Sequence, residues 1–85
     1  MKVKITDKNI REGTPGKGNF CPVHNALMDT EEFSFVTVGV RNIYFRKKFT
    51  EKETHVEIPN FLAEWIYNYD FGKKVSPIEF ELDIK

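Results

Sequence analysis

The sequence predicts an α+β domain, with a small, mostly antiparallel sheet of four to five strands and one long and one or two short helices packed on one face. Several stretches either alternate apolar with polar residues or are dense in β-branched and aromatic residues, as strands are. The segment from Pro59 to about Asp70 instead repeats apolar residues at helical spacing. A chain of 85 residues is of single-domain size, so we expect one domain over 1–85.

The first element is a short strand over Lys2–Thr6, in which Val3 and Ile5 share one face and the lysines face water. This pattern is typical of an edge strand. Thr6 or Asp7 then caps a helical turn that runs to Glu12 and is anchored by Ile10. The segment 13–19 is too rich in glycine and proline to continue any element, and we call it the glycine loop.

A second short helix follows the glycine loop. Pro22 suits the first helical position, where its missing N–H would be unpaired anyway, and this makes Cys21 the N-cap. Val23, Ala26 and Leu27 then stand at i, i+3 and i+4 and predict one buried stripe.

The middle of the chain predicts a three-stranded meander. In the first strand, 33–40, one face carries Phe33, Phe35 and Thr37 and the other Val36, Val38 and Val40, so both faces are expected to be covered, as in a central strand. In the second, 43–49, one face carries Ile43, Phe45, Lys47 and Phe49, and the solvent face carries Tyr44, Arg46 and Lys48. A turn of three to five residues near 50–53 leads to a short third strand, 55–58.

The longest helix carries its buried stripe on Leu62, Trp65, Ile66 and Tyr69, widened by Phe61. Gly72 is expected to end it in the left-handed conformation. The last strand, 78–84, alternates most regularly of all, with isoleucine, phenylalanine and leucine inward. The sequence leaves open whether this strand pairs with the first strand or with another.

The composition of the chain argues against several classes of protein. Thirteen basic and thirteen acidic residues cancel, which argues against an acidic nucleic-acid mimic and against a non-specific nucleic-acid binder. A single cysteine forms no internal disulfide, and His24 and His55 have no partner at metal-ligand spacing, so neither a metal nor a cofactor is expected. The first residues lack a signal peptide's apolar run and no stretch approaches a membrane span, which favours a cytoplasmic protein that does not bind membranes.

Cys21 at a helix N-terminus, with His24 three residues on, is the sharpest chemical signal. The helix dipole and an imidazolium both stabilise a thiolate, so a reactive thiol is one interpretation. The interpretation we favour is structural, with the thiol capping the helix or packing under Phe20.

Two further features suggest binding. Lys17 in the glycine loop, before a helix N-terminus, could hold an anion, although the spacing is not that of a P-loop and a purely structural loop is favoured. Arg41, Tyr44, Arg46 and Lys48 make a basic strand face that could bind single-stranded nucleic acid or could only be solvated. Tyr67, off the buried helix stripe, could add to a protein-binding surface.

Several stretches together resemble a set of small uncharacterised bacteriophage and prophage proteins: the segments 5–13, 21–23 and 69–73, with Ile58-Pro59 before a helix and Phe80-Glu81-Leu82 near the end. These proteins carry a Cys-Pro-[Val/Ile]-Ala-x-Ala type segment after a glycine turn. Here His24 stands where the first of those alanines is expected and Asn25 precedes Ala26, so His24 is not part of the pattern, which weakens the interpretation of a Cys-His pair.

The resemblance implies a phage-type accessory protein and carries no known activity. With no assembled catalytic constellation in the sequence, we expect a non-enzymatic protein that binds a host or defence-system protein in the host cytoplasm, for example an anti-CRISPR inhibitor. The alternatives are a nucleic-acid-binding accessory protein that uses the basic strand face, and a small thiol enzyme that uses Cys21. Either a monomer or a homodimer paired through edge strands fits the sequence.

Overall fold

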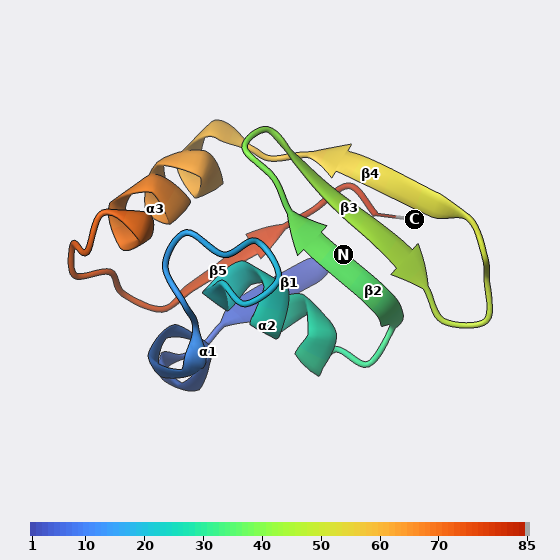
Figure 1. Ribbon diagram of the computed structural model, residues 1–85, viewed down its shortest axis with the longest axis horizontal. Coiled ribbons are helices and arrows are strands. Elements are labelled where there is room, and N and C mark those ends of the chain that lie inside the picture. The colour runs from blue at the N-terminus through green and yellow to red at the C-terminus, as the bar shows by residue number, and fades with distance from the viewer. Residues whose placement is uncertain (85) are drawn as a thin grey trace.

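The computed structural model describes residues 1–84 (Figure 1). The strands are β1 (Lys2–Ile5), β2 (Phe33–Val38), β3 (Asn42–Lys47), β4 (Glu53–Glu57) and β5 (Ile78–Glu81), and the helices are α1 (Asp7–Glu12), α2 (Pro22–Asp29) and α3 (Asn60–Asp70). Each strand pairing is antiparallel, which confirms the α+β class. No helix within 1–84 is both long enough and apolar enough to cross a lipid bilayer.

The five strands form two sheets, so the single sheet of four to five strands is not found. One sheet holds β1 and β5, and the other has the order β2-β3-β4. The outer edge of β2 is closed by the glycine loop, because the Val38 N–H donates to the Gly18 carbonyl at 3.0 Å. β1 and β5 pair only with each other, so no strand pairing joins the two sheets.

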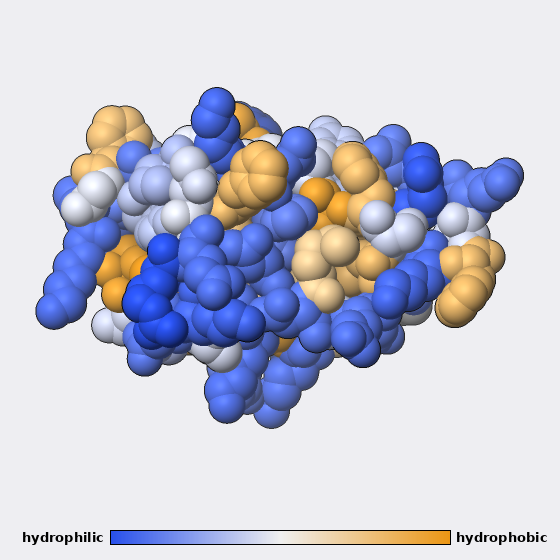
Figure 2. Space-filling model, turned by 60° about the horizontal axis from the view of Figure 1, so that its bottom comes forward, coloured by the Kyte–Doolittle hydropathy of each residue, from blue (hydrophilic) through white to orange (hydrophobic). Residues whose placement is uncertain are grey.

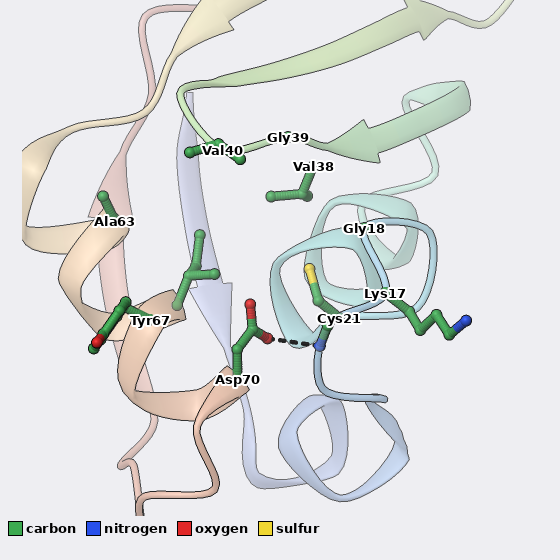
Figure 3. Close-up of a pocket in the computed structure, with 11 residues that line it drawn as sticks. Lys17, Gly18, Cys21, Val38, Gly39, Val40, Ala63, Tyr67 and Asp70 are labelled. Atoms are coloured by element: carbon green, nitrogen blue, oxygen red, sulfur yellow. Dashed lines mark hydrogen bonds between the residues drawn. The ribbon is translucent and has the colours of Figure 1, made fainter.

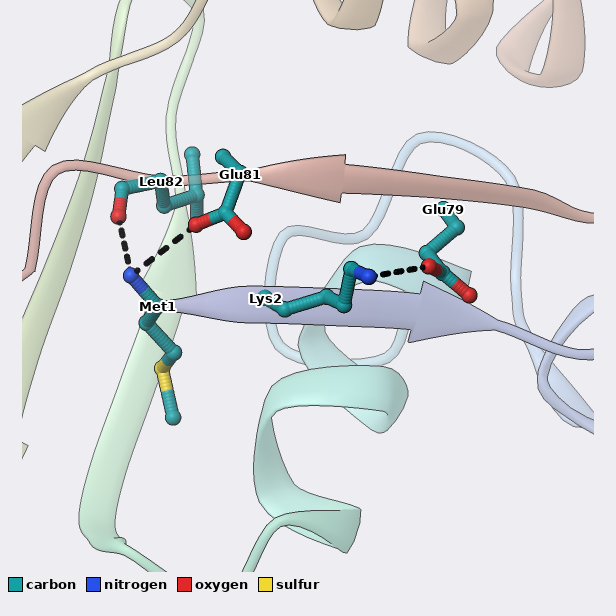
Figure 4. A network of polar contacts seen from close by, with 5 residues as sticks. All are labelled: Met1, Lys2, Glu79, Glu81 and Leu82. Atoms are coloured by element: carbon teal, nitrogen blue, oxygen red, sulfur yellow. Dashed lines mark hydrogen bonds and ion pairs between the residues drawn. The ribbon is translucent and has the colours of Figure 1, made fainter.

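The two ends of the chain lie together, which resolves the position of the last strand. Val3 pairs with Phe80 in the β1–β5 ladder. The Met1 amino group donates to the Leu82 carbonyl at 2.7 Å and lies 3.4 Å from the Glu81 carboxylate (Figure 4). Lys2 and Glu79 form an exposed ion pair at 3.0 Å, which lowers the pKa of the Glu79 carboxyl by its hydrogen bond and charge.

The core lies between the sheets and the helices. α2 packs against both β1 and β2, and its predicted stripe is buried as expected. Fully buried side chains come from every layer: Val3, Ile5, Val23, Leu27, Phe33, Ile43 and Leu62. α3 buries Leu62 and Tyr69, whereas Trp65 and Ile66 are half-buried. The predicted α3 stripe is therefore confirmed at Leu62 and Tyr69 and is shallower at Trp65 and Ile66. Phe61 does not widen it, because this residue is 53% exposed.

β2 differs from its prediction in three ways. A bulge between Phe33 and Phe35 adds one residue, so Phe33 turns inward with Val36 while Phe35 stays outward. The strand ends at Val38, and Val40 is 90% exposed at the tip of the β2–β3 turn. β2 is also an edge strand, with β3 in the centre. Strict alternation misses the bulge because it assumes no inserted residue, and it gives neither the end of a strand nor its neighbours.

The β3–β4 connection also departs from the alternation pattern. β3 ends at Lys47, and Phe49, which was predicted to face inward, is fully exposed with φ +67°. The left-handed conformation turns the chain away from the core before Phe49 can reach it. The five residues of this connection agree with the predicted length, and Gly72 after α3 has the expected positive φ, +77°.

Asn9 is a buried polar residue that the sequence did not single out. Its backbone N–H donates to the Thr6 hydroxyl at 3.2 Å and its side-chain oxygen accepts from the Thr6 N–H at 2.9 Å, which is a capping box. Its side-chain amide also donates to the Asp29 carboxylate at 2.8 Å. Thr6 is therefore the cap of α1, and Asn9 ties α1 to the end of α2.

Candidate binding surface

The solvent face of the β2-β3-β4 sheet gathers aromatic and charged side chains, and we call it the outer sheet face. It consists of Phe35, Thr37, Asn42, Tyr44, Arg46, Glu53, His55 and Glu57. The Tyr44 and His55 rings lie 5.8 Å apart across the β3–β4 ladder. The Arg46 guanidinium lies 5.9 Å from the centre of the Phe35 ring, its partner across the β2–β3 ladder. Each of the two ladders of this sheet therefore has one contact that involves an aromatic ring.

The charge on the outer sheet face is mixed. Arg46 stands opposite Glu53, and Asn42 stands opposite Glu57, so β4 places one carboxylate beside a cation of β3 and a second beside a neutral side chain. The basic strand face predicted from β3 alone is therefore interrupted, because the sequence did not show which strand lies next to it. A phosphate backbone would meet both charges here.

A hollow of about 470 Å³ lies between the glycine loop, the β2–β3 turn and α3, and we call it the hollow (Figure 3). Its lining residues are Gly16, Lys17, Gly18, Cys21, Val38, Gly39, Val40, Ala63, Ile66, Tyr67 and Asp70. The Cys21 sulfur and the Val38 side chain point into it, and the Lys17 side chain extends away from it (Figure 3). The lining is mostly apolar, and α3 adds the polar side chains of Tyr67 and Asp70.

The glycine loop is closed by groups of this chain. The Gly16 N–H donates to the Asp70 carboxylate at 2.9 Å, and the Thr14 N–H donates to the Phe20 carbonyl at 2.8 Å. The Phe20 N–H in turn donates to the Lys17 carbonyl at 2.9 Å. Since an internal carboxylate already takes the Gly16 N–H, these contacts favour the structural interpretation of the loop over an anion site.

Cys21 caps α2, as predicted, and is only 2% exposed. Its sulfur accepts from the His24 backbone N–H at 3.5 Å, while the His24 ring nitrogen Nδ1 lies 3.0 Å from the Asn25 side-chain oxygen. Burial, as the largest effect, raises the pKa of the Cys21 thiol above its ordinary value. A nucleophilic cysteine needs a lowered pKa, so this environment is that of a structural thiol.

From the burial and the raised pKa of Cys21 we predict how fast its thiol is labelled. At pH 8 the native thiol should react with an aromatic disulfide reagent at least about tenfold more slowly than the urea-unfolded chain, because it is buried and protonated. The neutral thiol's contribution to stability is full below the ordinary thiol pKa and declines as the pH rises above it. Faster labelling of the folded chain than of the unfolded chain would contradict the structural assignment.

The structure separates the predicted binding residues into groups. Tyr44 and Arg46 lie on the outer sheet face, and Tyr67 and Lys17 line the hollow. Arg41 lines a second hollow on the other side of Val40. Lys48 is exposed just after β3, toward the β3–β4 connection.

The β2–β3 turn joins the outer sheet face to the hollow. A Cβ built on Gly39 would lie 3.4 Å from the Tyr44 ring, and Gly39 and Val40 both line the hollow. Val40 lines the second hollow as well. Sequence reasoning assigned Val40 to a buried strand face and therefore missed it. The available signal was the preceding glycine, which marks a turn where a valine is left in solvent.

No protein-family model matches this sequence, nor does any curated protein or solved structure. Among residues 1–84, no three histidine, cysteine, aspartate or glutamate side chains come together as metal ligands would. The resemblance to small phage proteins stays a prediction.

Proposed function

We propose that this is a non-enzymatic binding protein that acts stoichiometrically on another protein. In its concrete form it is a phage-type anti-defence inhibitor, directed at a host or defence-system protein in the cytoplasm. The observation that carries the proposal is the junction at the β2–β3 turn, where exposed Tyr44 and Val40 stand beside a hollow of about 470 Å³. An exposed ridge beside an apolar hollow is the shape that a partner's side chains can interlock with.

The residue types at this junction support protein recognition. Tyrosine and arginine are enriched among residues that dominate binding energy, and Tyr44, Arg46 and Tyr67 supply them. Tyr67 packs against Phe71 at 4.4 Å between ring centres, so its ring is held in place before binding. In the view of Figure 2, hydrophobic residues form several separate areas between hydrophilic ones.

Nucleic-acid binding is the second candidate, and the paired rings of Tyr44 and His55 beside Arg46 favour it. Glu53 and Glu57 on the same face oppose it, because they repel phosphates. The two candidates differ in salt dependence, since phosphate contacts weaken steeply as salt rises and mixed protein contacts do not.

The test begins with a tagged pull-down from bacterial lysate, with and without nuclease. We expect one stoichiometric protein partner that survives nuclease. Tyr44→Ala and Tyr67→Ala should then weaken binding to that partner by about tenfold or more, as substitutions of central interface residues do. Lys8→Ala, an exposed residue of α1 away from the junction, is the matched control and should leave the Kd unchanged.

Recovery of nuclease-sensitive material alone would reject the protein-binding proposal and promote the outer sheet face as a nucleic-acid site. Unchanged affinity in the Tyr44→Ala, Tyr67→Ala double variant would show that the partner binds elsewhere on the molecule. Titration calorimetry at two salt concentrations gives the affinity and its salt dependence in the same experiment.

A further inference from the structure

β4 is the open edge of the three-stranded sheet. The sheet order β2-β3-β4 leaves β4 with a neighbour on one side, and in Figure 1 no element lies beyond it at the upper margin. Four of its five residues are exposed, and Val56 is half-buried. Among the described residues, then, β4 presents a strand edge to solvent.

The register shows which backbone groups this edge offers. The Ile58 N–H donates to the Arg41 carbonyl at 2.8 Å, so alternation along the antiparallel ladder directs the backbone groups of Val56 and Thr54 toward β3. The same alternation directs those of Glu53, His55 and Glu57 away from β3. Three residues therefore present N–H and C=O groups along the open edge.

Of the features that usually protect a strand edge from pairing, β4 has its short length and the charged Glu53 and Glu57, and it lacks the others. β4 contains neither lysine nor arginine nor proline, and its pairing with β3 runs without a bulge. At the end of the opposite edge, the Val38 N–H of β2 is taken by the Gly18 carbonyl. The β4 edge has no such partner among the described residues and stays available.

The charge of the edge indicates what pairs with it. Glu53 and Glu57 stand four residues apart on one face with His55 between them, and opposite-charge pairs across neighbouring strands are stabilising. Arg46 stands beside Glu53 on β3, whereas Glu57 has the neutral Asn42 there. The complementary strand carries lysine or arginine at two positions four residues apart.

We propose that β4 receives an extended, basic segment of the partner protein as an added fourth strand. The inference rests on the proposed function and specifies its mode of recognition: backbone hydrogen bonds to Glu53, His55 and Glu57, with basic side chains over the two carboxylates. Thr54 and Val56 on the inner face accept small or β-branched residues at the intervening positions.

A second copy of this chain fits the edge less well. Antiparallel self-pairing centred on His55 places Glu53 directly opposite Glu57 of the other copy, and does so twice. Like charges directly opposite each other are destabilising. The acidic pair therefore discriminates against self-association and in favour of a basic strand.

The experiment uses the full chain and two fluorescent peptides, Thr-Lys-Val-Thr-Val-Lys-Thr and its counterpart with glutamate at both lysine positions. Fluorescence anisotropy should show saturable binding of the basic peptide, with the acidic peptide weaker by about fivefold or more, because two cross-strand pairs change sign. The Glu53→Lys, Glu57→Lys double variant should reverse this preference. Absence of saturable binding of the basic peptide overturns the proposal.

His55→Pro tests the edge itself. Proline removes the outward N–H of His55 and leaves the ladder to β3 intact, since edge strands tolerate proline at such positions. Binding should be lost in His55→Pro and kept in the control His55→Ala, with both melting as cooperatively as the parent chain. Equal binding of the basic peptide by His55→Pro overturns the proposal, as does a dimer in sedimentation velocity that His55→Pro abolishes.

The same variant separates this inference from the proposed function. A protein partner that binds His55→Pro as tightly as the parent chain removes the β4 mode and leaves the proposed function standing. Failure to recover any protein partner removes the proposed function, while the two peptides still report on the edge.

Discussion

Phe33→Ala is expected to destabilise the fold by about 3–5 kcal/mol, the largest effect of any single truncation that we predict. Phe33 is fully buried, and its ring meets the Phe45 ring edge-on at 5.4 Å between centres. The bulge in β2 turns it into the core, so its removal opens a cavity beside Phe45. Native proteins are more stable than their unfolded chains by only about 5–15 kcal/mol, so this loss is a large part of the total free energy of unfolding.

Chemical denaturation followed by circular dichroism measures this loss. Phe35→Ala is the matched control, because Phe35 lies two residues away on the solvent side of the bulge and is half-exposed. Its truncation should cost about 1 kcal/mol or less, as surface substitutions do. If the two variants lost equal stability, the assignment of Phe33 to the core and Phe35 to the surface would be wrong.

Gly18→Ala is expected to have the second largest effect, about 3 kcal/mol, through steric overlap. A Cβ at this position would lie 2.3 Å from the Val38 carbonyl oxygen and 3.2 Å from its carbon. Backbone cannot yield as a flexible side chain does, so the loop must lift off β2 and lose the hydrogen bond from the Val38 N–H to the Gly18 carbonyl. The edge of β2 and the wall of the hollow would change together.

Hydrogen exchange at the Val38 amide reports this directly, since protection should fall in Gly18→Ala. Gly16→Ala is the control from the same loop. A Cβ on Gly16 meets nothing within 4 Å, and its positive φ of +74° costs about 1 kcal/mol of backbone strain. Val38 should therefore stay protected in Gly16→Ala, and loss of protection in both variants would mean that strain, and not the contact with β2, governs the loop.

Local features of the chain could be predicted from sequence because short-range chemistry determines them. Proline at the first turn placed Cys21 at the cap of α2, and Gly72 ended α3 with a positive φ, as each residue's backbone preference requires. The buried stripe of α2 followed from the 3.6-residue period alone. These predictions need no knowledge of distant partners.

Long-range features could not be predicted in the same way. One inserted residue at the β2 bulge reversed the side of Phe33, and periodicity contains no signal for it. The division into two sheets depends on which strands meet, and the hollow is assembled from a loop, a turn and a helix far apart in sequence. The exposure of Tyr44 and Arg46 was predicted correctly from the alternation of β3. That carboxylates of β4 lie on the same face could be seen only from the β3–β4 register.

The pairing of β1 with β5 has a consequence for how the chain folds. Val3 and Ile5 are fully buried, yet β1 pairs with residues that are synthesised about 75 positions later. The β2-β3-β4 meander has only local pairings and can form early, whereas β1 must wait until β5 has left the ribosome. We therefore expect the pairing of β1 with β5 to form late in assembly, and ribosome-bound chains that stop before Ile78 to carry an unpaired, half-apolar strand.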